Sequence, residues 1–200
     1  MLLGILYLAM RYRPEHKEEV HEKIVKDAAR RVRAEGLTGA AVSAVMRDAG
    51  LTHGGFYKHF DSKDQLLMES LSEGFREIAD QLAQAGEKAQ PGTAWKAIVK
   101  FYLSPEHCDH ADHGCPLVAL GPELARVGKA AKPQVVSELV KYKNRMVPFM
   151  PGKRTADKEK AFFVIFSSMI GAIEIARLLP DPAIREKVLG NVREFLLNSF

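Results

Sequence analysis

Apolar residues recur at helical spacing along most of this chain. The segment from Pro14 to about Glu35 shows the pattern clearly. Every fourth position is apolar, charged residues occupy the other faces, and Gly36 stands where a helix would end. The segment is therefore predicted to be one amphipathic helix, and its apolar stripe consists of Val20, Ile24, Ala28 and Val32.

Two short helices and a long one are predicted next. The short helices cover about 42–49 and 53–59 and are separated by a turn that contains Gly50. The long helix begins at Lys63, where the residue before it, Ser62, or Asp61 one position earlier, supplies a side-chain oxygen that caps its first turn.

The second half of the chain also shows helices and no sheet. A break over 84–92 ends the long helix, Thr93 is expected to cap the next one, and residues 104–114 are expected to form an exposed polar loop. No run of alternating apolar and polar residues suggests a strand, so the chain is predicted to be all-α with about nine helices. The remaining helices are predicted over 115–127, 133–147, 155–179 and 182–199.

Composition agrees with an ordinary folded protein. Of 200 residues, 46% are hydrophobic and 27% charged, values that argue against disorder, collagen-like sequence and a membrane protein. Two cysteines are too few for a secreted disulfide framework, so we expect a cytoplasmic protein. No cofactor is expected. The net charge of +4 is unevenly placed, because residues 1–63 hold 11 Lys and Arg against 8 Asp and Glu. A modest basic excess permits nucleic-acid binding without demanding it.

The first ten residues are apolar but too short to cross a membrane. As a helix they would span about 15 Å, against roughly 30 Å for a bilayer core. Arg11 and Arg13 follow the apolar run, whereas a signal peptide has its positive charges before it. Residues 1–14 are predicted to be an N-terminal extension. Either Met10 is the natural start, the interpretation we prefer, or the extension packs on the body of the protein.

Residues 36–60 have the outline of a helix-turn-helix. Gly50 suits the tight turn, and Leu51 and Phe56 attach the second short helix to the rest of the domain. The residues of the second short helix that are not needed for packing carry hydrogen-bonding groups, and two adjacent glycines among them allow close approach to a DNA groove. They are Thr52, His53, Gly54, Gly55, Tyr57, Lys58 and His59. The alternative is that the aromatic residues of this segment are core and its basic residues a solvated face, which we accept only for Phe56 and Phe60.

The run from Gly50 to Leu67, Gly-Leu-Thr-His-Gly-Gly-Phe-Tyr-Lys-His-Phe-Asp-Ser-Lys-Asp-Gln-Leu-Leu, resembles the DNA-binding signature of the TetR/AcrR family of bacterial transcriptional repressors. The resemblance extends over about 15–67. It implies a DNA-binding domain over 15–62 and a helical effector-binding and dimerisation domain over 63–200. It also implies phosphate contacts by Thr52, Tyr57 and His59, base or groove contacts by His53, Gly54, Gly55 and Lys58, and a backbone contact by Lys63.

One position departs from the family pattern. The family usually has Thr or Ser near the start of the first short helix, where a hydroxyl caps the helix and contacts a phosphate. This chain has Ala40 and Ala41 there, and Ser43 is the candidate substitute.

Reading a palindromic operator requires a homodimer, and the two C-terminal helices are the candidate interface. The helix over 155–179 is apolar nearly all round, with small residues that permit close helix approach, and the last helix has an apolar stripe. Two helices from each subunit would form a four-helix interface, which the resemblance also implies. An intramolecular core is the alternative. The candidate interface residues are Phe163, Ser167, Ile170, Gly171, Val188, Val192 and Phe195.

The resemblance also implies a cavity for a small-molecule effector of unknown identity. Apolar residues not used elsewhere are candidates for its lining, although such a set is often simply core. They are Trp95, Phe101, Tyr102, Met146, Phe149, Phe162, Phe166 and Met169.

Residues 107–115 contain three histidines and two cysteines but lack the ligand spacing of a structural zinc site, so no metal is expected. Cys115 is predicted at a helix N-terminus, where the helix dipole lowers the pKa of a thiol. Gly114 to Val118 also resembles a branch of TetR-like regulators in which a cysteine at this place senses electrophiles or oxidants, with Cys108 as a candidate resolving thiol. A small buried cysteine at a helix start is the alternative, and it is the interpretation we prefer.

Two other functions were weighed. A thiol- or metal-dependent enzyme would use Cys115 with His110 or His113, but no nucleophile, base and orienting group are recognisable together, so the protein is not expected to be an enzyme. A helical adaptor that has lost DNA binding would keep the fold without salt-dependent binding to duplex DNA. The sequence thus favours a DNA-binding repressor, released from its operator by a small molecule or by thiol modification.

Overall fold

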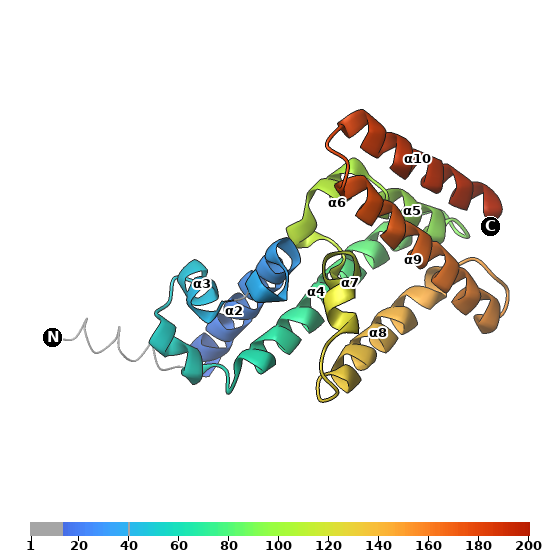
Figure 1. Cartoon of the computed structure of the whole chain (residues 1–200). Helices are drawn as coiled ribbons and strands as arrows, with labels where there is room; N and C mark the ends of the chain where they lie inside the picture. Colours follow the sequence, from blue (N-terminus) through green and yellow to red (C-terminus); the bar gives the residue numbers. More distant parts are fainter. Residues whose placement is uncertain (1–13, 40) are drawn as a thin grey trace.

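The computed structural model describes residues 14–39 and 41–200, and within them every regular element is helical (Figure 1). The proposed N-terminal extension lies almost entirely outside the described residues. The elements are α2 (Pro14–Glu35), η1 (Leu37–Gly39), α3 (Val42–Asp48), η2 (His53–Lys58), α4 (Lys63–Glu87), α5 (Ala94–Tyr102), α6 (Pro105–Asp109), η3 (Ala111–His113), α7 (Pro116–Ala125), α8 (Lys132–Met146), η4 (Val147–Phe149), α9 (Thr155–Arg177) and α10 (Pro182–Ser199).

The helices form two lobes joined by α4 (Figure 1). The N-terminal lobe consists of α2, η1, α3 and η2, and α2 packs along α4 through Ile24, Ala28 and Val32, all nearly inaccessible to solvent. The C-terminal lobe consists of α5 to α10. Because α4 has buried residues from Leu66 to Gly86, it is part of the core of both lobes.

Several local signals act as the sequence predicts. Gly36 and Gly50 adopt positive φ angles of +79° and +77°, the conformation that favours glycine at a helix end and in a tight turn. The Ser62 hydroxyl accepts a hydrogen bond from the Gln65 backbone N–H at 3.1 Å, which caps α4. No helix in the described part of the chain is long and apolar enough to cross a membrane.

Two local expectations are wrong. Thr93 precedes α5 but does not cap it with its side chain, because its hydroxyl donates backward to the Gln90 carbonyl at 2.8 Å. Residues 104–114 are not an exposed loop. Ser104 caps the short helix α6, accepting from the His107 N–H at 3.2 Å, and Pro105 occupies its first position. The result buries His107 and Cys108.

Candidate nucleic-acid interface

The helix-turn-helix consists of α3, a tight turn and the six-residue 3₁₀ helix η2. In the turn, the Leu51 N–H donates to the Met46 carbonyl at 2.7 Å, which closes the end of α3. Phe56 is the buried anchor of η2, 2% exposed, and stacks on Phe60 at a ring-centroid distance of 5.4 Å. The sequence prediction that these two phenylalanines belong to the core is confirmed.

The opposite face of η2 has little contact with the protein. Thr52, His53, Gly54 and Lys58 are exposed, and Gly54 has no atom within 4 Å of the place where a side chain would begin. Tyr57 is 74% exposed although its side chain is large and aromatic. This face therefore offers hydrogen-bonding groups and open backbone, the chemistry that phosphate contacts and base-edge readout in a DNA groove require.

His59 lies at the edge of this face, half-buried, beside basic groups from α2. Its Nδ1 is buried without a hydrogen-bond partner among the described residues. The pKa of His59 is lowered from 6.5, by burial first and then by the positive charges of His21, Lys17 and Lys58. A neutral ring is favoured there. The sequence did not reveal that Lys17 lies near His59, because 42 positions separate them in a chain whose α2 packs beside η2 only in the folded structure.

Two further predicted DNA contacts lie at helix starts. Ser43 is exposed in the first turn of α3, and Lys63 is exposed as the first residue of α4. Ala41 precedes α3 and supplies no side-chain cap, as its methyl group dictates, and Ala40 lies outside the described residues. The predicted contacts thus lie at the start of α3, in and beside η2, and at the start of α4.

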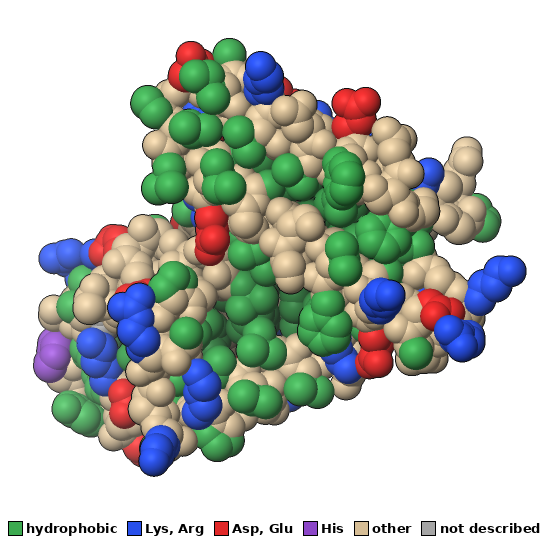
Figure 2. Space-filling view, turned by 45° about the vertical axis from the view of Figure 1, so that its right-hand side comes forward, with side chains coloured by type: hydrophobic (Ala, Val, Ile, Leu, Met, Phe, Trp, Pro, Cys, Tyr) green, Lys and Arg blue, Asp and Glu red, His purple; other side chains and the backbone are tan. Residues whose placement is uncertain are grey.

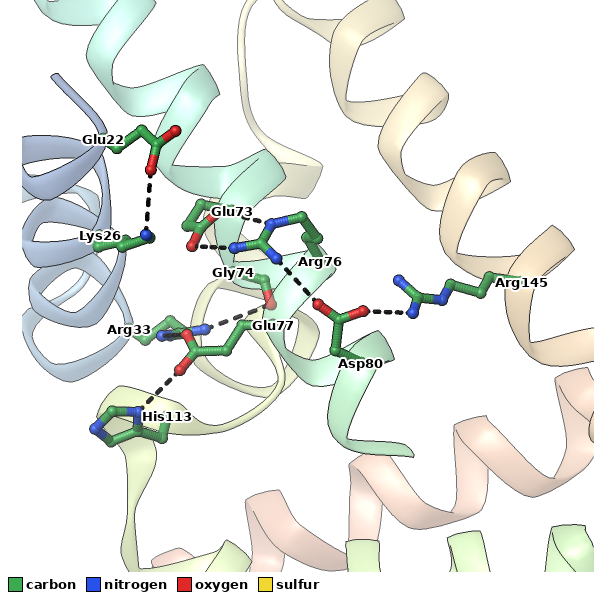
Figure 3. A network of polar contacts seen from close by, with 10 residues as sticks. All are labelled: Glu22, Lys26, Arg33, Glu73, Gly74, Arg76, Glu77, Asp80, His113 and Arg145. Atoms are coloured by element: carbon green, nitrogen blue, oxygen red, sulfur yellow. Dashed lines mark hydrogen bonds and ion pairs between the residues drawn. The ribbon is translucent and has the colours of Figure 1, made fainter. Parts of the chain in front are cut away.

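A buried arginine connects this lobe to the C-terminal lobe (Figure 3). The Arg33 side chain, 1% exposed, donates to the Glu77 carboxylate at 2.6 Å, and that carboxylate also contacts His113 Nδ1 at 3.0 Å. Burial raises the pKa of Glu77, but the hydrogen bonds from Arg33 and His113 outweigh it and lower the pKa overall. No sequence signal singled out Arg33, since its partner is 44 positions away.

A second contact joins the same end of α2 to α7. The Leu37 backbone N–H lies 3.3 Å from both carboxylate oxygens of Glu123. Leu37 begins the segment that leads to α3, so a shift of α7 changes a hydrogen bond one step from the helix-turn-helix.

The comparisons with known proteins agree with this geometry. The sequence model of the family "Bacterial regulatory proteins, tetR family" matches residues 24–69. Residues 24–69 are thus similar to this family's sequence model, and they include the helix-turn-helix. No curated protein matches the chain.

Solved structures of TetR-family regulators share the fold over nearly the whole chain. A TetR regulator from Chloroflexus aurantiacus has 19% identity and a TM-score of 0.73, covering 92% of this chain and 96% of that one. A TetR-family regulator from Cytophaga hutchinsonii has 17% identity and a TM-score of 0.72, covering 91% and 95%. The regulator FadR from Bacillus subtilis, solved in complex with stearoyl-CoA, has 14% identity and a TM-score of 0.63, covering 90% and 98%. The all-α prediction and the resemblance are confirmed.

The C-terminal lobe, α5 to α10, is the larger of the two, and most predicted effector-pocket residues lie in its interior. Phe166 is central, with its ring 6.1 Å from Tyr102 and 4.5 Å from Phe162. Trp95 instead lies beside Phe200, 6.1 Å between ring centroids. Phe101 is 36% exposed, Phe149 is half-buried, and the others are buried. The sequence missed Tyr142, whose ring lies 5.5 Å from Phe166, because it occurs within a strongly polar helix.

A cleft of about 1010 Å³ lies elsewhere, between α2, α4 and the start of α8. Its lining includes Val25 and Met68 and mostly acidic charged side chains. These are Glu18, Glu22, Asp64, Glu69, Glu73 and Glu138, with Lys26 and Arg76 as the basic exceptions.

The thiol expectation needs correction. Cys115 is the residue before α7, as predicted, but it is completely buried, and burial raises its pKa although the nearby Tyr102 hydroxyl and the Leu117 and Val118 backbone N–H groups lower it. Desolvation therefore outweighs the helix dipole. Cys108 is 2% exposed with a pKa also raised by burial. Among the described residues no three His, Cys, Asp or Glu side chains converge as metal ligands.

The two C-terminal helices pack on each other and leave apolar side chains on the surface. Of the predicted interface residues, Phe163 and Phe195 are 58% and 69% exposed, Ser167 is exposed, and Ile170, Gly171, Val188 and Val192 are partly buried. Leu178 at the end of α9 is 82% exposed and was not predicted. Figure 2 shows such apolar side chains at the surface of the upper part of the molecule, where Figure 1 places α9 and α10.

Proposed function

We propose that this protein is a transcriptional repressor that binds a palindromic operator as a homodimer and leaves it when an effector binds. Residues 15–62 serve as the DNA-binding domain, and residues 63–200 hold the effector and form the dimer. The protein acts in the cytoplasm as a regulator rather than an enzyme. The observation that carries the proposal is the exposed face of η2, where Tyr57 is displayed to solvent beside Lys58 and an open glycine backbone.

The division of roles on that face follows from chemistry. Lys58 and the hydroxyls of Thr52 and Tyr57 donate to phosphate oxygens or base edges, and Gly54 lets the backbone approach the groove. Ser43 and Lys63 add contacts at two helix starts, and His53, Gly55 and His59 complete the surface. Neutral His59 serves as a hydrogen-bonding group rather than as a cation.

The dimer is proposed from the exposed apolar residues of α9 and α10. Large apolar side chains on two adjacent helices are rarely left to solvent in a monomer, and contiguous patches of them mark association surfaces. Pairing this surface with its copy gives a two-fold interface and fixes the spacing of the two reading segments.

Release requires an effector that binds the non-operator conformation better than the operator-bound one. The contacts of Arg33 with Glu77 and of Leu37 with Glu123 give a physical route, because the first joins α2 to α4, which connects the two lobes, and the second joins η1 to α7 of the C-terminal lobe. The stearoyl-CoA complex of the Bacillus subtilis regulator supports effector binding by proteins of this fold. Modification of Cys115 is disfavoured as a route to release, because the thiol is completely buried and burial raises its pKa.

The test is binding to a duplex enriched from a random-sequence pool, followed by fluorescence anisotropy. Tyr57→Ala and Lys58→Ala should each weaken binding about tenfold or more, since a good base or phosphate contact contributes about 1–3 kcal/mol. The matched control is Lys100→Ala, an exposed lysine on α5. If both variants bind like the parent, the interface assignment is wrong, and if the parent itself shows no salt-dependent binding to duplex DNA, the adaptor alternative is correct.

A further inference from the structure

Two tyrosine hydroxyls end inside the C-terminal lobe without a partner. Tyr102 on α5 is 0% exposed and Tyr142 on α8 is 3% exposed, and neither hydroxyl has a hydrogen-bond partner of good geometry among the described residues. A buried hydroxyl that lacks a partner costs about 1–3 kcal/mol, and phenylalanine would fill nearly the same space without that cost. Packing alone therefore does not explain tyrosine at either position.

The two hydroxyls are neighbours of one another and of one thiol. The pKa of Tyr102 is raised well above 10, by burial first and then by Cys115 and Tyr142. The pKa of Tyr142 is raised in the same way, by burial and then by Cys115. Three helices, α5, α7 and α8, thus bring three weak donors to one place in the interior.

The walls around these donors are aromatic. The Phe166 ring of α9 lies within 6.1 Å of Tyr102 and 5.5 Å of Tyr142, and the Phe75 ring of α4 lies 5.5 Å from Tyr142. On the other side, the His107 ring lies 4.6 Å from Tyr102, and its Nε2 is also buried without a partner among the described residues.

The cluster is neutral at physiological pH. Both phenols and the Cys115 thiol keep their protons, and the pKa of His107 is lowered to about 4 by burial and then by Arg177. Arg177 is a nearby cation, but its guanidinium donates to the Cys108 and His107 carbonyls at 2.8 and 3.4 Å. Burying a charged ligand here would lack compensation, whereas a neutral acceptor oxygen would satisfy the free donors.

We propose that Tyr102, Tyr142 and Cys115 form an effector site for a small neutral molecule with an apolar body and one hydrogen-bond-accepting oxygen, as in a ketone. The two phenol O–H groups donate to the carbonyl oxygen, and the rings of Phe166 and Phe75 hold the body. The regulatory part of this inference rests on the proposed function, whereas the binding site itself does not.

The position of the site explains how occupancy reaches the DNA-binding lobe. The three residues of the site are buried, so a ligand reaches them only when the helices around them move apart. Cys115 is the residue before α7 and lies two positions after His113, which contacts Glu77 and through it Arg33 of α2. Glu123 of the same helix holds the Leu37 N–H. A shift at the start of α7 therefore disturbs both contacts between the lobes.

The first experiment measures binding to the DNA-free protein by calorimetry, with acetophenone and 2-hexanone as probes. Ethylbenzene, which lacks the oxygen, and benzoate, which adds a charge, are the matched comparison ligands. We expect at least one ketone to bind tenfold or more tightly than both comparison ligands, and Tyr102→Phe and Tyr142→Phe each to weaken it tenfold or more. Equal binding of all ligands, or no binding of either ketone at millimolar concentration, would overturn the proposal.

Stability gives a second readout that a purely structural role would not produce. Removing an unpartnered hydroxyl should leave the melting temperature of ligand-free Tyr142→Phe equal or higher, while its ketone affinity falls. The control is Ser70→Ala, which removes a buried hydroxyl that donates to the Leu66 carbonyl at 2.6 Å and should not change ketone affinity. If Tyr142→Phe is clearly less stable than the parent, the hydroxyl is structural and the proposal is wrong.

Operator release is measured separately, by adding the ketone to the DNA complex. Binding through the two tyrosines without release would contradict the regulatory role and leave the binding site standing. Release that survives both Tyr→Phe changes would contradict this site and leave the proposed function standing.

Discussion

The exposed face of η2 and the interior around Tyr142 both hold polar groups that the protein itself does not use, but they hold them in opposite environments. Tyr57 is 74% exposed, whereas Tyr102 and Tyr142 are almost completely buried without a partner of good geometry among the described residues. An exposed hydroxyl is hydrated and costs the fold nothing, while a buried one without a partner costs stability. The exposed face of η2 is therefore suited to a large, charged partner, and the interior around Tyr102 and Tyr142 to a small, neutral one.

The largest effect is expected from variants that disrupt the proposed dimer, in which two η2 faces are held at a fixed spacing. Leu178→Glu combined with Phe195→Glu should give a folded monomer, because both side chains are exposed and contribute little to the core. Operator affinity should fall at least about 1000-fold, since a monomer contacts one half-site only. Light scattering measures the mass of the protein in solution, and fluorescence anisotropy measures its affinity for the operator.

The matched control for the dimer is Val136→Glu with Val140→Glu. These exposed apolar residues of α8, 48% and 47% exposed, lie outside the proposed interface. The control should stay dimeric. A control that becomes monomeric, or a double variant of α9 and α10 that stays dimeric, would move the interface elsewhere.

The next effect concerns the buried His107. Its folded pKa of about 4 lies below the ordinary 6.5, so the stability it contributes is complete above pH 6.5 and is lost as the pH falls toward 4. The difference corresponds to up to about 3 kcal/mol. His107→Gln should therefore show a smaller loss of unfolding free energy over this range, measured by urea denaturation at several pH values. The exposed His110→Gln should follow the parent, and a parallel loss in His107→Gln would refute the assignment.

Arg33→Met tests the contribution of the Arg33–Glu77 contact to stability. Removing the guanidinium leaves the Glu77 carboxylate poorly paired, and we expect a loss of about 2 kcal/mol in unfolding free energy near neutral pH. Because the pKa of Glu77 is lowered, its contribution is complete above its ordinary value near 4.5 and disappears as the pH falls through the lower folded value, so parent and variant should converge in acid.

Two further variants show whether the stability loss in Arg33→Met comes from the ion pair with Glu77. Arg33→Met with Glu77→Gln should recover part of the loss, because the carboxylate no longer needs a cation. Arg30→Met, an exposed arginine of the same helix, should change stability little. A loss of equal size in Arg30→Met would show that the ion pair is not its source.

The smallest losses of stability are expected at two helix starts, Ser62 before α4 and Thr93 before α5. Ser62→Ala should cost about 1 kcal/mol, since the hydroxyl caps α4. Thr93→Ala should cost less, because the Thr93 hydroxyl bonds the preceding turn and does not cap α5. Equal losses in chemical denaturation would contradict this distinction.

The sequence predicted the DNA-binding lobe far better than the C-terminal lobe. The turn at Gly50 and the exposure of Thr52 and Tyr57 follow from local geometry, so the order of residues in the chain predicts them. By contrast, the environments of Arg33 and Tyr142 arise from partners on other helices, which periodicity does not reveal. Cys115 illustrates the limit, because its place at a helix start was correct while its depth of burial, which sets its pKa, depends on the packing of three further helices.

The measurement that tests the central claim most directly is selection of duplex DNA from a random-sequence pool by the purified protein. The account predicts enrichment of a palindromic sequence with half-sites about one helical turn or more apart, and loss of that enrichment with Lys58→Ala. A pool that stays random, or an enriched sequence without two-fold symmetry, would contradict a dimeric repressor that reads DNA through η2.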